Sequence, residues 1–132
     1  MEDSVFTKII KGEIPCHKVY EDDKTIAFMD IHPTQPGHVV VAPKVQVNFV
    51  WDLEQDDYGA LMATVHKVGN RLRELFPGKA RIAATVEGLG ISNHAHVNVF
   101  PFDTAEEFRS IPDSSKEPDH NELAKMAEKL RF

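Results

Sequence analysis

Apolar and polar residues follow two different periods along the chain, and the changes between these periods mark the expected elements. Apolar positions three and four residues apart predict helices over residues 5–10, 54–76 and 121–130. Short apolar runs bounded by Asp, Gly or Pro predict strands over residues 18–21, 25–30, 39–42, 80–87 and 93–101. The first two strands are expected to form a hairpin, because the Asp22-Asp23 between them is a turn sequence.

The longest predicted helix carries one apolar stripe, which indicates the face that packs on a sheet. The stripe consists of Leu61, Val65, Val68, Leu72 and Leu75. One long helix among several short strands predicts an α+β fold, with a mostly antiparallel sheet of about five strands and short terminal helices. At 132 residues the chain is expected to form a single domain over 1–132, in which 103–132 are a C-terminal loop and short helix.

The composition argues against nucleic-acid and membrane partners. The net charge is −6 and no block of Lys and Arg is present to hold a nucleic-acid backbone, so we expect no nucleic-acid partner. No apolar run is long enough to span a bilayer, and we expect no membrane partner. The single cysteine, Cys16, allows no internal disulfide and is expected to be a small buried hydrophobe or an idle surface thiol. An acidic N-terminus without a signal-peptide pattern adds to the expectation of a cytoplasmic protein.

The stretch from Asn93 to Pro101 carries the most distinctive chemistry. Alternate side chains of a strand share a face, so His94, His96 and Asn98 are expected on one face and the intervening apolar residues on the other. Pro101 is expected to end the strand, because it has no N–H to donate to a ladder. Three interpretations are open: a phosphate site with a histidine nucleophile, a strand face satisfied by solvent or core, and a zinc-binding His-x-His pair.

This stretch resembles the signature of the histidine-triad (HIT) family, His-φ-His-φ-His-φ-φ with φ apolar, except that Asn98 replaces the third histidine. The N-terminal part of the chain carries further motifs of the same family in the same order. They are apolar-Phe-x-Lys-Ile-Ile-x-Gly-Glu-Ile-Pro at 5–15, Val-Tyr-Glu-Asp-Asp at 19–23, Phe-x-Asp-Ile-x-Pro at 28–33 and Pro-Gly-His at 36–38. The chain is therefore identified as a member of this family, and the α+β fold is expected to be HIT-like.

The resemblance implies roles for several residues. His96 matches the family nucleophile, which attacks an α-phosphorus and forms a nucleotidyl-histidine that water then hydrolyses, while His94 and His38 match positions that orient it. Asp30 matches the ribose-binding position, and its alternative role is to cap a turn. An apolar pocket would hold the base. Its matching residues, for which core packing is the alternative, are Val5, Phe6, Ile9, Phe28, Met29, Ile31 and Val40.

Departures from the family pattern bear on activity. Asn98 can donate a hydrogen bond to a phosphate oxygen, but it cannot transfer a proton as a histidine does near neutral pH. The galactose-1-phosphate uridylyltransferases, a related branch, carry Gln at this place and transfer nucleotides. Val86 replaces the Asn that often precedes the triad, which removes a polar phosphate contact. The Gly-Gln-Ser/Thr segment is absent, and Ser92 is the candidate substitute for its hydroxyl.

The resemblance also bears on metals and partners. Some members bind structural zinc through two cysteines, a histidine in Pro-Lys-x-His and the first triad histidine. Here the first three places hold Ser4, Thr7 and Gln46, so we expect no metal and no other cofactor. The implied partner is a purine nucleoside monophosphate or a derivative, with adenine and guanine both open. By resemblance the protein is a homodimer joined through the long helix and the strand over 80–87.

The leading hypothesis is a nucleotide-binding hydrolase or nucleotidyl transferase that acts at the α-phosphate of a nucleoside monophosphate derivative. The alternative is a nucleotide-binding protein with weak or lost turnover, because the third triad histidine is Asn98 and Val86 removes a phosphate contact. A scaffold with an unused pocket is a third hypothesis, and the retained His38 and Asp30 argue against it.

Overall fold

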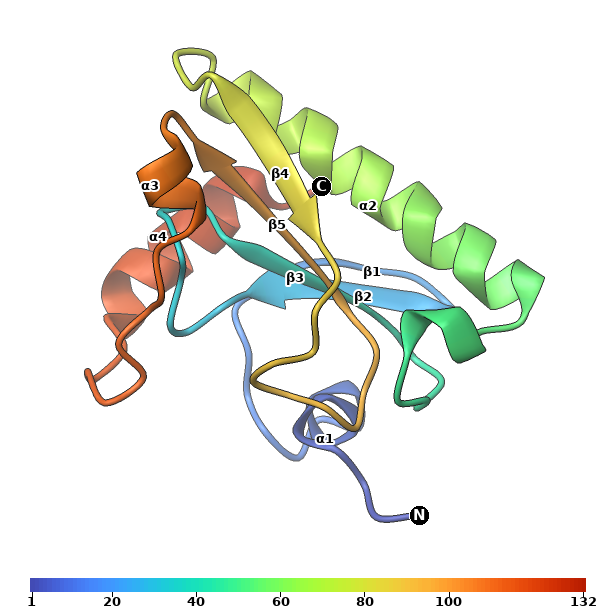
Figure 1. The fold of residues 1–132 in the computed structure, drawn as a ribbon. Helices are drawn as coiled ribbons and strands as arrows, with labels where there is room; N and C mark the ends of the chain where they lie inside the picture. The colour runs from blue at the N-terminus through green and yellow to red at the C-terminus, as the bar shows by residue number, and fades with distance from the viewer.

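Five antiparallel strands form one sheet in the spatial order β1–β2–β3–β5–β4 (Figure 1). The computed structural model describes residues 1–132. The strands are β1 (Lys18–Glu21), β2 (Thr25–Met29), β3 (Val39–Pro43), β4 (Arg81–Thr85) and β5 (Val97–Phe102). The helices are α1 (Val5–Ile10), α2 (Gln55–Leu75), α3 (Ala105–Phe108) and α4 (His120–Leu130), with a 3-10 turn η1 (Val50–Asp52). The predicted α+β class and five-stranded antiparallel sheet are confirmed.

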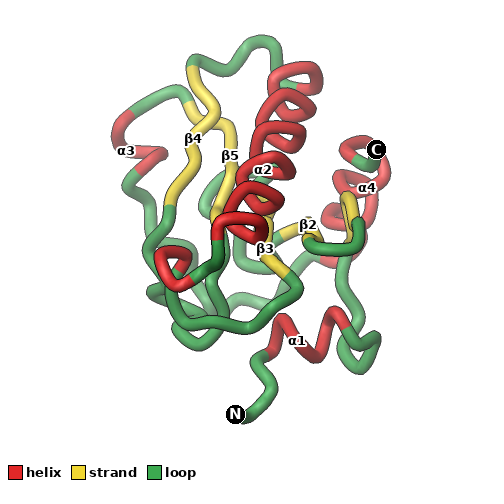
Figure 2. The backbone as a smooth tube through the Cα atoms, turned by 90° about the vertical axis from the view of Figure 1, so that its right-hand side faces the viewer, coloured by secondary structure: helices red, strands yellow, loops and turns green.

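Helix α2 lies along one face of the sheet, and α4 packs beside it at the β1 end (Figure 1 and Figure 2). The predicted stripe accounts for this packing, because Leu61, Val68 and Leu72 are fully or almost fully buried against the sheet. Alternation along the strands then divides the apolar side chains between two faces. Val39 and Val41 of β3 join the core under α2, which also receives Leu123, Ala127 and Leu130 from α4.

The opposite face of the sheet has a smaller apolar cluster beside α1. Phe6 of α1 packs here with Phe28 of β2 and Val40 of β3, and the rings of Phe6 and Phe28 meet edge to face at 5.2 Å. Because β3 contributes to both clusters, all five of its residues are buried. A strand covered on both faces needs an uninterrupted apolar run, which explains the sequence Val-Val-Val-Ala-Pro.

The histidine-bearing strand begins later and ends later than predicted. It starts at Val97, so His94 and His96 lie in the segment before β5, and of the three residues only Asn98 belongs to the strand. The strand also continues through Pro101, which pairs with Ile82 of β4. Proline is tolerated at this point because β3 pairs with β5 only as far as Val99, so one side of Pro101 has no ladder to interrupt.

Two short elements were not predicted from the sequence pattern. The turn η1 precedes α2, and α3 lies within residues 103–120, which were expected to be an irregular loop. Thr104 caps α3, since its side chain accepts a hydrogen bond from the backbone N–H of Glu107. An element this short carries no hydrophobic period to identify it. No helix combines the length and apolar character that a bilayer crossing requires.

Residues 1–132 are expected to form one folding unit. A substitution on the packed face of α4 tests this expectation. Leu130 is 1% exposed in the core under α2, and the Arg71 guanidinium caps the end of α4 through the carbonyls of Lys129 and Leu130. Leu130→Ala should lower the free energy of unfolding by about 2–5 kcal/mol, because it leaves a cavity in a packed core. Urea denaturation measures this loss.

Lys129→Ala is the matched control in the same helical turn, since its side chain is exposed. That variant should stay within about 0.5 kcal/mol of the wild type. Equal stability of the wild type and the Leu130→Ala variant would show that α4 is not part of the cooperative unit.

Candidate active site

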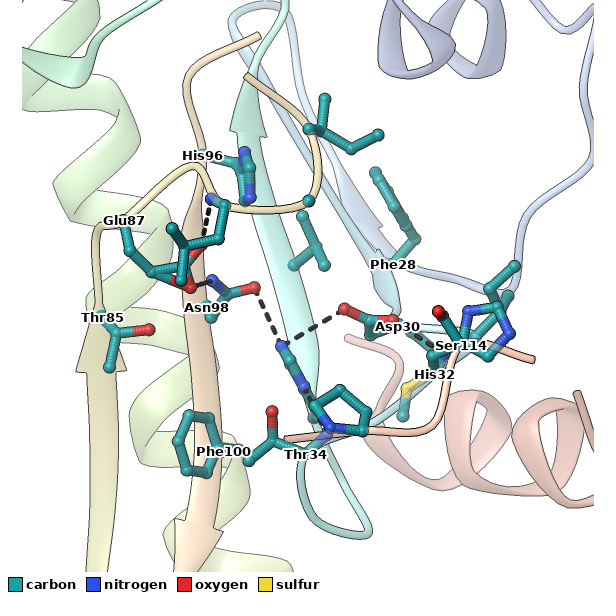
Figure 3. A pocket seen from close by; sticks show the side chains of 18 of the residues that line it. Phe28, Asp30, His32, Thr34, Thr85, Glu87, His96, Asn98, Phe100 and Ser114 are labelled. Atoms are coloured by element: carbon teal, nitrogen blue, oxygen red, sulfur yellow. Dashed lines mark hydrogen bonds and ion pairs between the residues drawn. The ribbon is translucent and has the colours of Figure 1, made fainter. Parts of the chain in front are cut away.

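A cavity of about 840 Å³ opens on the face of the sheet opposite α2. The central strands line it through Phe28 of β2, Val40 of β3 and Asn98 of β5. Figure 3 shows Phe28 and Asn98 among the lining side chains. Helix α1 and the segments after β4 and after α3 form its walls. The volume lies within the range of about 300–1,000 Å³ that is typical of small-molecule sites.

His96 is buried at this cavity with one ring nitrogen fixed. Its Nδ1 lies 2.8 Å from the backbone carbonyl oxygen of His94, which can only accept, so Nδ1 carries the proton and donates. In the neutral form of the ring, Nε2 is therefore the nitrogen that keeps the lone pair. The edge-to-face ring of Phe6, 5.1 Å away, restrains the imidazole further. This is the tautomer that a nucleophilic histidine requires.

A chain of hydrogen bonds joins His38, Asn98 and Glu87 across the cavity (Figure 3). The backbone N–H of Thr34 donates to His38 Nδ1 at 3.0 Å, so this nitrogen is the acceptor and Nε2 carries the proton. His38 Nε2 then donates to Asn98 Oδ1 at 2.9 Å, which turns the amide nitrogen of Asn98 toward Glu87 Oε2 at 3.1 Å. The donors and acceptors of all three side chains are thereby assigned.

Gly37 determines the position of His38, the histidine in this series of hydrogen bonds. Its φ of +92° is unfavourable for other residues, and a Cβ there would lie 3.0 Å from the Phe76 ring. Only glycine allows the loop to pass this close to Phe76 and enter β3 with the imidazole of His38 turned into the cavity.

Asp30 follows β2 and lines the cavity. The two oxygens of its carboxylate make different contacts. Oδ1 accepts from the backbone N–H of His32 at 2.8 Å, which is the turn-capping interaction considered above. Oδ2 lies 3.6 Å from His38 Nε2 and keeps acceptor capacity toward the cavity. A ligand hydroxyl group can therefore reach this carboxylate without breaking the turn.

The cavity also collects the apolar residues that were expected around a base. Val5, Phe6, Ile9, Phe28, Met29, Ile31 and Val40 all line it. The alternative, core packing, also describes several of them, because Phe6, Phe28 and Val40 belong to the smaller buried cluster. Ser92 is exposed and does not line the cavity, whereas its neighbour Ile91 does.

Comparison with known proteins decides the family. The HIT domain model matches residues 11–105. An uncharacterized HIT-like protein of Borreliella burgdorferi is 33% identical over 106 residues, which cover 76% of each chain. The chain belongs to the HIT domain family. The adenosine 5′-monophosphoramidase hnt1 of Schizosaccharomyces pombe is 32% identical over 101 residues, covering 74% of this chain and 72% of that protein.

A solved structure agrees with this assignment. A HIT-like protein from Bartonella henselae, described as involved in cell-cycle regulation and crystallised with an unknown ligand, superposes with a TM-score of 0.80. The two chains are 28% identical, and the match covers 98% of this chain and 95% of that one. HIT family proteins are nucleotide-binding hydrolases and transferases, and they include the monophosphoramidase named above.

In this HIT protein His94 lies outside the cavity and is fully buried. Its Nε2 donates to the Pro43 carbonyl at 2.8 Å, and its Nδ1 accepts from the Ser4 hydroxyl at 2.7 Å. Burial lowers the pKa of His94 and keeps the imidazole neutral. Its contact with His96 runs through its backbone carbonyl, so any orienting effect comes from the position of the main chain.

The places that hold zinc ligands in some HIT members come together around His94. Ser4 and Thr7 stand at the start of α1, where Ser4 Oγ caps the helix and Thr7 Oγ1 donates to Gln46 Oε1 at 2.7 Å. The set offers one imidazole nitrogen, two hydroxyl groups and one amide oxygen. Structural zinc prefers thiolate and imidazole ligands, so these residues do not fit the metal. Their mutual hydrogen bonds give each of them a partner instead.

Several cavity residues could not be identified from the sequence. The segment over 108–114, beyond the residues that match the family model, contributes Phe108, Arg109 and Ile111 to the wall. Cys16 also lines the cavity half-buried, and burial raises the pKa of its thiol, which leaves it a weak nucleophile. Glu87 is the third omission: it was assigned no role from the sequence, yet it contacts Asn98.

The donor set around His94 generates a test of metal binding. Purified protein dialysed against a chelator should contain no stoichiometric zinc by elemental analysis. The combined substitutions Ser4→Cys, Thr7→Cys and Gln46→His should create a site with His94 that retains zinc and raises the melting temperature when zinc is added. Stoichiometric zinc that survives dialysis of the wild type would contradict the assignment.

Proposed function

We propose that this protein is a nucleotide-binding hydrolase or nucleotidyl transferase that uses His96 to attack the α-phosphorus of a nucleoside monophosphate derivative. One observation carries the proposal: the His94 carbonyl holds Nδ1 of His96, so the free Nε2 belongs to a cavity that also contains Asp30 and an apolar slot. The substrate is a purine nucleotide whose ribose hydroxyl groups bind Asp30 and whose base enters the slot. A cytoplasmic location is part of the same proposal.

The reaction proceeds in two displacements. Nε2 of His96 forms a bond to phosphorus, the bond from phosphorus to the leaving group breaks, and the leaving group departs with the electron pair. Water or another acceptor then displaces His96 from phosphorus and releases the nucleotide. His38 and Asn98 act as groups of fixed orientation, because His38 Nε2 donates to Asn98 Oδ1.

The alternative is a nucleotide-binding protein that has lost efficient turnover. Asn98 motivates it, since an amide cannot protonate a leaving group. The Glu87 carboxylate motivates it further, because a negative charge beside Asn98 opposes a phosphate there. Calorimetric binding of a nucleoside monophosphate without release of product from an adenosine phosphoramidate would favour this alternative.

The proposed function predicts a role for Asp30 in binding the ribose. Asp30→Ala should weaken binding of a purine ribonucleotide by about 1–3 kcal/mol, the cost of losing hydrogen bonds to a charged group. Titration calorimetry measures the affinity. Asp23→Ala, at an exposed position of the β1–β2 turn, is the control and should bind like the wild type. Equal affinity of the two variants would remove Asp30 from the ribose site.

The second prediction concerns the leaving group. Because Asn98 supplies no proton, substrates with phenolic leaving groups should react faster than phosphoramidates of alkylamines. Asn98→His should raise turnover of the amine substrate more than that of the phenolic one, within the range of about 10²–10⁴-fold typical of acid–base catalysis. His96→Ala should abolish turnover of both substrates. Turnover that survives His96→Ala would contradict a histidine nucleophile.

A homodimer is also part of the proposal. Strand β4 is at the edge of the sheet with one unpaired side, and Tyr58 and Met62 of α2 are partly exposed. An unpaired edge beside apolar side chains favours association with a second copy. Sedimentation equilibrium should give twice the chain mass of 14.9 kDa at micromolar concentration. A mass of one chain under these conditions would contradict the dimer.

A further inference from the structure

Glu87 presents a carboxylate to the cavity at a fixed position. Its Oε1 accepts from the backbone N–H of Leu89 at 2.9 Å, and its Oε2 accepts from Asn98 Nδ2 at 3.1 Å. Gly88 between them has a φ of +67°, a conformation that lets the chain turn back so that Leu89 reaches the side chain. Figure 3 shows the carboxylate against the Asn98 amide, at the His96 side of the cavity.

His96, Asn98 and Glu87 all line the same cavity. Asn98 follows His96 by two residues, which corresponds to about 7 Å along an extended chain. A phosphorus bonded to His96 Nε2 in this cavity would therefore share it with Asn98 and the Glu87 carboxylate. The other carboxylate of the lining, Asp30, caps the turn at His32 and contacts His38 at the opposite end of the chain of hydrogen bonds.

The remaining groups near the phosphate are unable to take a proton from water. Nδ1 of His38 accepts from Thr34 and its Nε2 already carries a proton. Asn98 has no basic atom. His94 does not reach the cavity, and His96 itself is bonded to phosphorus once the intermediate has formed.

We propose, on the basis of the function proposed above, that Glu87 is the general base of the second displacement. Its carboxylate takes a proton from a water molecule as the water oxygen forms a bond to phosphorus. The bond between phosphorus and His96 Nε2 breaks, and its electron pair returns to the imidazole. Glu87 then releases the proton to solvent, which its exposed position in the cavity allows.

With Glu87 as the general base, the role of Asn98 is to hold the Glu87 carboxylate in position. A histidine at this place would transfer protons itself, whereas the amide holds a neighbouring carboxylate through Nδ2 and is held by His38 through Oδ1. Proton transfer is thereby moved from the third triad position to a residue 11 positions earlier in the chain. The competing interpretation is that the Glu87 charge only repels phosphate, and the two make opposite predictions for a neutral variant.

The experiment follows the p-nitrophenyl esters of AMP and GMP in full-length protein. The phenolate reports the first displacement, and free nucleotide reports the second. In Glu87→Gln the first displacement should continue while the second slows by about 10²–10⁴-fold. A burst of one phenolate per site should therefore precede a slow steady state. Intact-mass spectrometry should detect a nucleotidyl adduct that is absent from Glu87→Gln combined with His96→Ala.

Two further variants separate base catalysis from a structural effect. Glu87→Ala should be slow in the second displacement and should recover when formate is added, because the small carboxylate can occupy the vacated space. Glu128→Gln on the exposed face of α4 is the matched control and should behave like the wild type. A burst with an adduct in Glu87→Gln and formate rescue of Glu87→Ala support the assignment.

Three results would overturn it. Unchanged kinetics in Glu87→Gln would show that the carboxylate has no part in the reaction. Tighter nucleotide binding or faster turnover in Glu87→Gln would show that the Glu87 charge only repels the phosphate. Slower release of phenolate, with no burst and no adduct, would move Glu87 to the first displacement. If the wild type releases no phenolate at all, the enzymatic function proposed above fails, and the assignment of Glu87 fails with it.

Discussion

The buried imidazole of His94 joins three parts of the molecule that are distant in sequence. Its two nitrogens bond to Ser4 at the start of α1 and to Pro43 at the end of β3, and its main chain leads into β5. Neither nitrogen has solvent as an alternative partner, because the side chain is fully buried. An unsatisfied polar group would be costly here, so the three segments are held in one arrangement. That arrangement fixes the carbonyl to which His96 donates.

A second constraint operates on the other side of the cavity, where backbone and side-chain donors set each hydrogen-bonding direction in turn. The N–H of Thr34 determines the tautomer of His38, His38 determines the orientation of the Asn98 amide, and the amide positions Glu87. This series of hydrogen bonds begins at the backbone N–H of Thr34, which can only donate. The proposed reaction at phosphorus would therefore meet groups that are already oriented, which reduces the reorganisation needed in the transition state.

The sequence was sufficient where structure depends on local signals. The β1–β2 hairpin and α2 were predicted within one or two residues, because a turn sequence and a helical period identify them. The start of β5 was predicted too early, since residues before Val97 bond mainly to other segments; the N–H of Ala95, for example, donates to Val47. The family motifs brought His38, His96 and Asp30 together as candidates. The contact between Glu87 and Asn98 depends on tertiary structure, and no spacing rule could have indicated it.

In the proposed reaction, attack by His96 depends on histidine tautomers that hydrogen bonds preset. A long-range proton–nitrogen correlation spectrum of the imidazoles, recorded near neutral pH, measures these tautomers directly. The hydrogen bonds predict that the neutral form of His96 carries its proton on Nδ1, and that the neutral forms of His38 and His94 carry theirs on Nε2. A neutral His96 protonated on Nε2 would have its lone pair on Nδ1 and none on Nε2, which would contradict attack on phosphorus by Nε2.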